Sequence, residues 1–132
     1  MIKRISVIIL CVLLTFSLCS CNGDVSNVKI KNIKSDIFKN DEINSAVNVV
    51  INNFKENWNG CELKDICYVG DDSIDDDLTE QYGKGKVIVL QTSFYVGRFA
   101  DVGIEPDTTV SDYKWILIRD DMENWKHVND GR

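Results

Sequence analysis

The sequence predicts an α+β domain: one long N-terminal helix packed on a four-stranded antiparallel meander, with a short second helix between strands 1 and 2. Two observations favour this class. One amphipathic stripe at helical spacing comes first, and several apolar runs with the two-residue period of strands follow it. The order helix, strand, short helix and then three strands is typical of an α+β domain.

The first twenty residues have the layout of a secretory signal peptide. Lys3 and Arg4 form a short basic region, and an unbroken apolar run follows from Ile5 to Leu18. Fourteen helical residues span about 21 Å at ~1.5 Å per residue, whereas a bilayer core of ~30 Å needs about 20 residues. The run is therefore short for a permanent span, and an uncleaved membrane anchor is the less favoured alternative.

The residues that close this segment, Leu18-Cys19-Ser20-Cys21, resemble the bacterial lipobox. The resemblance implies that the Cys21 thiolate receives a diacylglyceryl group, that the chain is cleaved between Ser20 and Cys21, and that the new N-terminus is acylated. It divides the chain into a signal peptide at 1–20, a lipidated tether at 21–36 and a globular α+β domain at 37–132. The expected location is the outer, extracytoplasmic face of the cell membrane, with lipid as the anchor.

The composition describes an ordered, acidic domain. An apolar content of 44% and a single proline argue against disorder. Loss of Lys3 and Arg4 with the signal lowers the formal net charge from −6 to −8. A chain of this charge lacks the basic patch that binds nucleic acid, so no nucleic-acid partner is expected. The membrane is the predicted partner, and the ligand is left open.

The tether and the long helix come first in the domain. Residues 22–34 are polar and rich in lysine, so we expect a solvated linker there. A one-sided apolar stripe predicts the helix, with Asn40 or Asp41 as its cap and Asn59-Gly60 at its end. The stripe consists of Ile43, Ala46, Val47, Val50, Ile51, Phe54 and Trp58. Such a stripe indicates that the helix lies on a sheet.

The remaining elements follow in order along the chain. We expect a strand at 61–69, a short helix at 72–83, a strand at 87–96, a long loop at 98–112 and closing strands at 113–119 and 124–128, joined by a turn at 120–123. Ser73 is the predicted cap of the short helix. Trp115 and Trp125 are expected as cross-strand neighbours in the closing hairpin.

The strand at 113–119 is apolar on both faces, so each face needs cover. Trp115 points to one side of this strand and Ile116 to the other. One long helix covers one face. We expect the loop at 98–112 to cover the other face through Phe99, Val102 and Ile104. A protein partner or a homodimer formed through the sheet is the alternative.

Short motifs spread across residues 38–132 carry a family resemblance. They are Ile43-Asn44-x-Ala46, Phe54-Lys55, Gly60-Cys61-x-Leu63, Tyr82-Gly83, Ser93-Phe94, the loop at 104–109, Trp115-Ile116-Leu117-Ile118-Arg119 and Trp125-Lys126-His127-Val128. Together they resemble a family of small clostridial (Firmicutes) cell-surface lipoproteins that share an uncharacterised domain. The closing hairpin is also similar to that of cystatin-like and nuclear-transport-factor-like α+β folds. The family usually has glycines where Met122 and Glu123 stand here, and the resemblance implies no activity.

No residue set has the spacing of a reaction motif, so no catalytic residue is predicted. His127 is the only histidine, and a packed or exposed structural role is expected for it. The acidic run at 71–80 lacks the alternation of a calcium loop. Cys61 and Cys67 do not form zinc-finger spacing with His127, and about 20 Å separates them on one strand. We therefore expect no metal, no cofactor and two buried free thiols; a Cys61–Cys67 disulfide, which requires the segment to fold back, is the less favoured alternative.

Three classes of function remain open. The leading hypothesis is a membrane-tethered, non-catalytic binding or interaction domain. The second is a small-molecule pocket, binding or enzymatic, between helix and sheet, by analogy with folds of this type. Its candidate residues are Tyr95, Tyr113, Trp115, Arg119, Trp125 and His127. The third is a surface inhibitor or immunity protein. A deep cavity favours the second class, and a flat apolar patch favours the other two.

Overall fold

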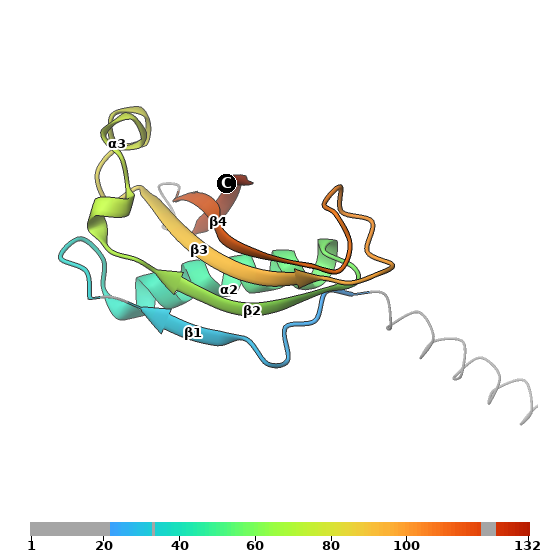
Figure 1. Ribbon diagram of the computed structural model, residues 1–132. Coiled ribbons are helices and arrows are strands. Elements are labelled where there is room, and N and C mark those ends of the chain that lie inside the picture. The colour runs from blue at the N-terminus through green and yellow to red at the C-terminus, as the bar shows by residue number, and fades with distance from the viewer. Residues whose placement is uncertain (1–21, 33, 120–123) are drawn as a thin grey trace, which may run out of the picture.

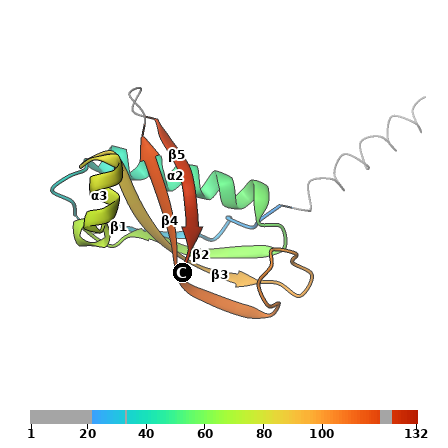
Figure 2. The same cartoon turned by 90° about the horizontal axis from the view of Figure 1, so that it is seen from above.

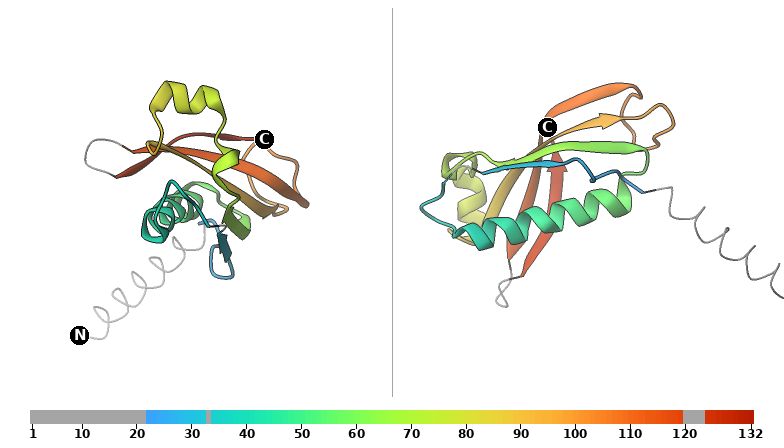
Figure 3. Two further views of the ribbon diagram at one scale, coloured as in Figure 1. Left: turned by 90° about the vertical axis from the view of Figure 1, so that its left-hand side faces the viewer. Right: turned by 90° about the horizontal axis from the view of Figure 1, so that it is seen from below.

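The computed structural model describes residues 22–132 except Ile33 and residues 120–123. One five-stranded sheet has the order β1-β2-β3-β4-β5. Helix α2 lies on one face of this sheet, and α3 lies on the opposite face (Figures 1 and 3). The strands are β1 (Lys29–Asn32), β2 (Cys61–Tyr68), β3 (Val87–Val96), β4 (Thr108–Arg119) and β5 (Trp125–Gly131), and the helices are α2 (Asn40–Asn57), the 3-10 helix η2 (Asp71–Ser73) and α3 (Asp76–Tyr82).

The predicted fold class is wrong, because the sheet is mixed and has five strands. Strand β1 pairs in parallel with β2, so that Lys29 lies opposite Asp65. The other three pairings are antiparallel, and the sheet rather than one helix dominates the domain. Strand β1 was not predicted because its sequence, KIKN, is short and mostly polar. Its one apolar side chain, Ile30, is 50% exposed. Lysines are typical of edge strands, where they oppose pairing with another chain.

The segment predicted as a linker is part of the folded domain. The Gly23 N–H donates to the Lys55 carbonyl at 2.9 Å, and the Asp24 N–H donates to the Cys61 carbonyl at 2.8 Å. A Cβ atom on Gly23 would stand 2.3 Å from the Phe54 carbonyl oxygen, closer than real Cβ contacts. Glycine therefore permits this close approach, and the chain is held against the C-terminal end of α2 from Gly23 onward.

Helix α2 buries the predicted face but is capped differently. Its N-cap is Lys39, one residue before the predicted positions, because the Glu42 carboxylate accepts a hydrogen bond from the Lys39 N–H at 3.0 Å. The short helix is also divided. Ser73 belongs to η2, and α3 is capped by Asp75, whose carboxylate accepts from the Leu78 N–H at 2.8 Å. Aspartate and serine are about equally favoured at helix N-caps, so the sequence alone did not decide between them.

The closing hairpin has a different register from the one expected. Strand β4 begins at Thr108, five residues earlier than predicted. Trp125 lies opposite Arg119, while Trp115 lies opposite Asp130, so the two tryptophans are not cross-strand neighbours. An irregularity in the pairing at Ile116 shifts the last residues of β5 along β4. Such a bulge cannot be located from the period of the sequence alone.

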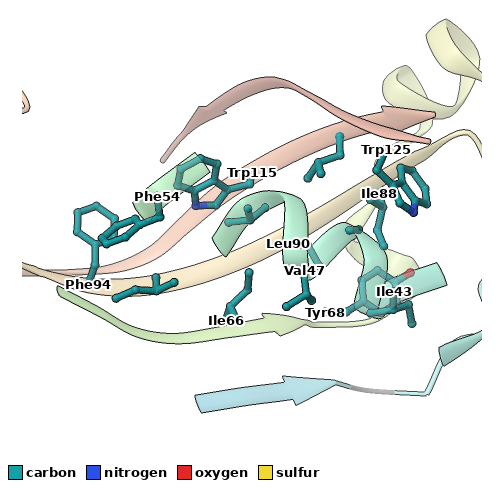
Figure 4. Close-up of a cluster of buried hydrophobic side chains, with 14 of the residues drawn as sticks. Ile43, Val47, Phe54, Ile66, Tyr68, Ile88, Leu90, Phe94, Trp115 and Trp125 are labelled. Carbon is teal, nitrogen blue, oxygen red and sulfur yellow. The ribbon is translucent and has the colours of Figure 1, made fainter. Parts of the chain in front are cut away.

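The hydrophobic core lies between α2 and the sheet. Figure 4 shows Phe54, Phe94 and Trp115 gathered at one end of this layer and Ile43, Tyr68 and Trp125 at the other. The rings of Phe54 and Trp58 stack with 5.6 Å between their centroids and 4° between their planes. The rings of Trp58 and Phe94 meet edge to face, with centroids 5.0 Å apart. These contacts fix the C-terminal end of α2 on strands β3 and β4.

The opposite face of the sheet is covered by α3 and not by the loop at 98–112, which corrects the prediction. Val87 and Val89 alternate with core residues along β3, so they face away from α2, and both are buried. Helix α3 lies over this part of the sheet (Figure 3, left). Val102 and Ile104 pack against the main core instead, and Phe99 is 93% exposed. A homodimer through the sheet stays a prediction.

The contribution of α2 is tested by Phe54→Ala. Phe54 is fully buried, so we expect this truncation to lower the free energy of unfolding by about 3–5 kcal/mol. The matched control is Phe99→Ala, which removes the same atoms from an exposed site. It should change the free energy of unfolding by less than about 0.5 kcal/mol. Urea unfolding followed by tryptophan fluorescence measures both. Equal, small effects would contradict the core assignment.

Candidate functional site

The six side chains predicted to share one pocket are divided among three places. The Tyr95 hydroxyl donates to Asp107 at 2.8 Å on an exposed part of β3. Arg119 and Trp125 lie near the N-terminal end of α2, where both contact Glu42. The others, Tyr113, Trp115 and His127, lie together around β4 and β5. Tyr95 is separated because it alternates with Phe94 along β3 and faces away from α2. Arg119 and Trp125 face α2 like Tyr113 and Trp115, but they lie further along the hairpin.

Arg119 ties the hairpin to α2. Its guanidinium forms an ion pair with Glu42, its Nε–H donates to the Gly85 carbonyl at 2.7 Å, and its Cζ lies 4.8 Å from the Trp125 ring centroid. The Lys39 N–H and the Arg119 guanidinium together hold the pKa of Glu42 below its usual value. An open groove of about 380 Å³ lies beside this ion pair. Because its Nε and Nη1 donors are engaged with Gly85 and Glu42, Arg119 has a structural role here.

Tyr113, His127 and Asp130 form a second polar cluster. The Tyr113 hydroxyl donates to Asp130 Oδ1 at 2.5 Å. His127 Nε2 lies 2.9 Å from Asp130 Oδ2. This nitrogen is shielded from solvent and is not aligned for a hydrogen bond with any described residue. Burial, reinforced by the Asp130 carboxylate, raises the pKa of Tyr113 far above its usual value, so its hydroxyl remains a donor.

Buried hydrogen bonds hold this cluster on the sheet. Trp115 Nε1–H donates to Thr92 Oγ1 at 2.9 Å, and the Thr92 hydroxyl donates to the Tyr113 carbonyl at 3.2 Å. Thr92 is the buried polar residue of β3, and both of its hydrogen-bonding roles are satisfied. The His127 ring lies against Trp115 with centroids 5.1 Å apart. These contacts hold Tyr113, Trp115 and His127 in fixed positions on strands β4 and β5.

An open groove of about 500 Å³ lies beside Tyr113, within the size range of small-molecule sites. We call it the Tyr113 groove; it is lined by Ile104, Glu105, Thr108, Thr109, Val110, Tyr113 and Arg132. Edge contacts with Trp58 and Phe94, at centroid distances of 5.6 and 5.2 Å, position the Tyr113 ring. Sequence reasoning identified only Tyr113 here, because the other residues come from a loop, a strand start and the last residue.

The acidic run at 71–80 is partly structural. Asp71 accepts hydrogen bonds from the Ser35 hydroxyl at 2.5 Å, the Tyr68 hydroxyl at 2.5 Å and the Asp36 N–H at 2.9 Å. Burial opposes ionisation of Asp71, but these donors outweigh it and lower the pKa of the carboxyl. Within the part of the chain that the structure describes, no three His, Cys, Asp or Glu side chains form a group that can hold a metal ion.

The two cysteines of the domain are free thiols. Cys61 is buried and Cys67 is half-buried, so the expectation of two buried thiols holds fully only for Cys61. Burial raises the pKa of both thiols, which disfavours the reactive thiolate. Neither cysteine lines the Tyr113 groove.

The predicted lipidation and cleavage residues, Cys21 and Ser20, lie outside the described residues, as does the turn at 120–123. In residues 22–132, with the same gaps, no helix has the length and apolarity needed to cross a membrane. Comparison with models of known families, with curated proteins and with solved structures found no match to this chain. The lipoprotein family resemblance therefore stays a prediction.

The role of Asp71 is tested by Asp71→Asn. Because its pKa is lower in the folded state than the ordinary value near 3.8, the carboxylate stabilises the fold above that pH. We expect the variant to lose about 1–3 kcal/mol of unfolding free energy at pH 7. This difference should shrink as the pH falls through the folded pKa of Asp71. Urea titrations at several pH values measure it, and Asp101→Asn in an exposed loop is the control.

Proposed function

We propose that the chain is a lipid-anchored, extracytoplasmic domain that binds a ligand and does not catalyse a reaction. The main evidence for the lipid anchor is the lipobox-like sequence Leu18-Cys19-Ser20-Cys21, which follows the apolar run. The position of Gly23 supports it, because the folded domain begins two residues after Cys21. Lipidation at that cysteine would hold the domain directly at the membrane surface.

The polar cluster around Asp130 supports a binding role over a catalytic one. A general base must place a free nitrogen or oxygen within hydrogen-bond reach of its substrate. His127 Nε2 is shielded from solvent beside Asp130. The Tyr113 hydroxyl is engaged with the same carboxylate, and its raised pKa opposes proton loss. Both groups therefore act in positioning the groove floor.

The Tyr113 groove is the proposed ligand site. It is lined by the apolar residues Ile104 and Val110, by Tyr113, and by two residues of opposite charge, Glu105 and Arg132. The Thr108 hydroxyl is already engaged with the Glu105 carbonyl at 2.5 Å. The lining suits a small molecule or chain segment with an apolar body and a polar or charged group.

The anchor is tested by Cys21→Ala. Membrane-extracted parent protein should have the intact mass of a chain that starts at Cys21 plus acyl groups, while the variant should lack the acyl mass and its firm membrane attachment. Membrane fractionation and mass spectrometry make these measurements. The variant's urea midpoint is the folding control. An unmodified parent chain that starts at Met1 would contradict lipidation.

The groove is tested with anilinonaphthalene sulfonate, an apolar fluorophore with one anionic group. We expect saturable fluorescence enhancement with the parent and its loss in Thr109→Trp, because the exposed Thr109 lines the groove and a large ring there fills it. The matched control is Ser45→Trp, which places the same ring in the groove beside Arg119. Equal binding by all three proteins would show that the Tyr113 groove is not the site.

A further inference from the structure

We propose that Phe99, at the tip of the loop between β3 and β4, is a second membrane contact that inserts into the lipid surface beside the anchor. This inference rests on the proposed lipid anchor at Cys21. It concerns the surface that faces the bilayer, which is separate from the Tyr113 groove as a binding site. The occupant is the membrane itself.

The start of the folded chain and the Phe99 loop lie at the same end of the domain. A Cβ atom on Gly23 would stand 3.0 Å from the Trp58 carbonyl oxygen, at the end of α2. Two residues later, Gly60 accepts a hydrogen bond from the Gly97 N–H at 3.0 Å, and its own Cβ would stand 3.0 Å from Ala100 Cα. A continuous set of backbone contacts therefore joins the beginning of the domain to the loop.

The ribbon views agree with these contacts. The described chain starts at the end of the molecule where β3 passes into the loop, and α3 lies toward the opposite end (Figures 1 and 2). Two residues of extended chain span at most about 7 Å, so a lipid attached two residues before Gly23 would be tethered close to this end of the domain. An acylated Cys21 would therefore bring this end of the domain, with its loop, to the membrane surface.

The loop holds Phe99 out in solvent in a defined position. The Ala100 N–H donates to the Gly97 carbonyl at 3.2 Å, so Phe99 is a corner residue of a tight turn. On the far side of the turn, Val102 and Ile104 pack against the main core. Phe99 itself is 93% exposed. One exposed apolar side chain is ordinary, and it is the combination of a pinned turn with this location that indicates membrane contact.

The charged residues around Phe99 limit the depth to which its ring enters the lipid. Arg98 is paired with Asp107 at 3.9 Å, and Asp101 and Glu105 are exposed on the same loop. Carboxylates stay in water, so the ring inserts at the level of the headgroups and the first acyl carbons. Anionic headgroups repel this acidic loop, so the contact should be closer on zwitterionic vesicles than on anionic ones.

The test places a tryptophan at the loop tip in the full, processed lipoprotein. Phe99→Trp is reconstituted into phosphatidylcholine vesicles in which brominated acyl chains quench nearby tryptophans. We expect a loss of emission beyond that of the parent, whose Trp115 and Trp125 are buried and whose Trp58 is partly buried. Bromines near the headgroup end of the acyl chain should quench more strongly than bromines near its methyl end. Adding phosphatidylglycerol should reduce the quenching.

The matched control is Gln81→Trp, an exposed position on α3 at the far end of the domain, which should show no added quenching. Vesicle flotation of each sample reports the anchor separately. Protein that floats while Phe99→Trp stays unquenched would overturn this inference and leave the anchor intact. Protein that does not float would overturn both. A concentration-dependent blue shift in the emission of the Phe99→Trp variant without lipid would show that a second copy covers the loop, which also overturns the inference.

Discussion

Burial of the apolar face of α2 against the sheet is the interaction on which the rest of the structure depends. It brings Phe54 and Trp58 onto Phe94, and this ring cluster in turn supports Tyr113 and the groove beside it. The same helix end receives Gly23, which joins the first residues of the domain to the core. A loss of this packing would therefore affect the groove, the start of the domain and the loop at once.

Three carboxylates join parts of the chain that are far apart in sequence. Glu42 links α2 to the closing hairpin through Arg119, and Asp71 links the residues before α2 to the end of β2. Asp130 links β5 to β4 through Tyr113. Hydrogen bonds to charged groups are stronger than those between neutral partners, so these three acceptors hold the edges of the fold. In an acidic domain, these carboxylates act as connectors rather than as a metal site.

The two ends of the domain differ in the side chains that they expose. The end that holds Gly23 carries the pinned turn with its exposed Phe99, and the opposite end carries α3, whose first turn is acidic. The Tyr113 groove begins at Ile104, on the same loop as Phe99.

The amino-acid sequence by itself determined the elements that have a regular apolar period. The stripe of α2 and the strand Val87–Val96 were predicted because burial on one side leaves a repeating pattern. The lipobox-like motif is local too, so it is visible without a structure. Strand β1 was missed because its four residues, with Ile30 as the one apolar side chain, are too few to form a repeating pattern.

Tertiary structure alone decided the pairings that join distant residues. The six predicted pocket residues were separated because Tyr95 faces away from α2, while Arg119 and Trp125 lie further along the hairpin than Tyr113 and Trp115. The Tyr113 groove unites Ile104, Val110 and Arg132 only after the loop packs on the core. The partners of Glu42, Asp71 and Asp130 depend on how remote segments meet. Local periodicity records which side of an element is buried, but it contains no information about what lies against that side.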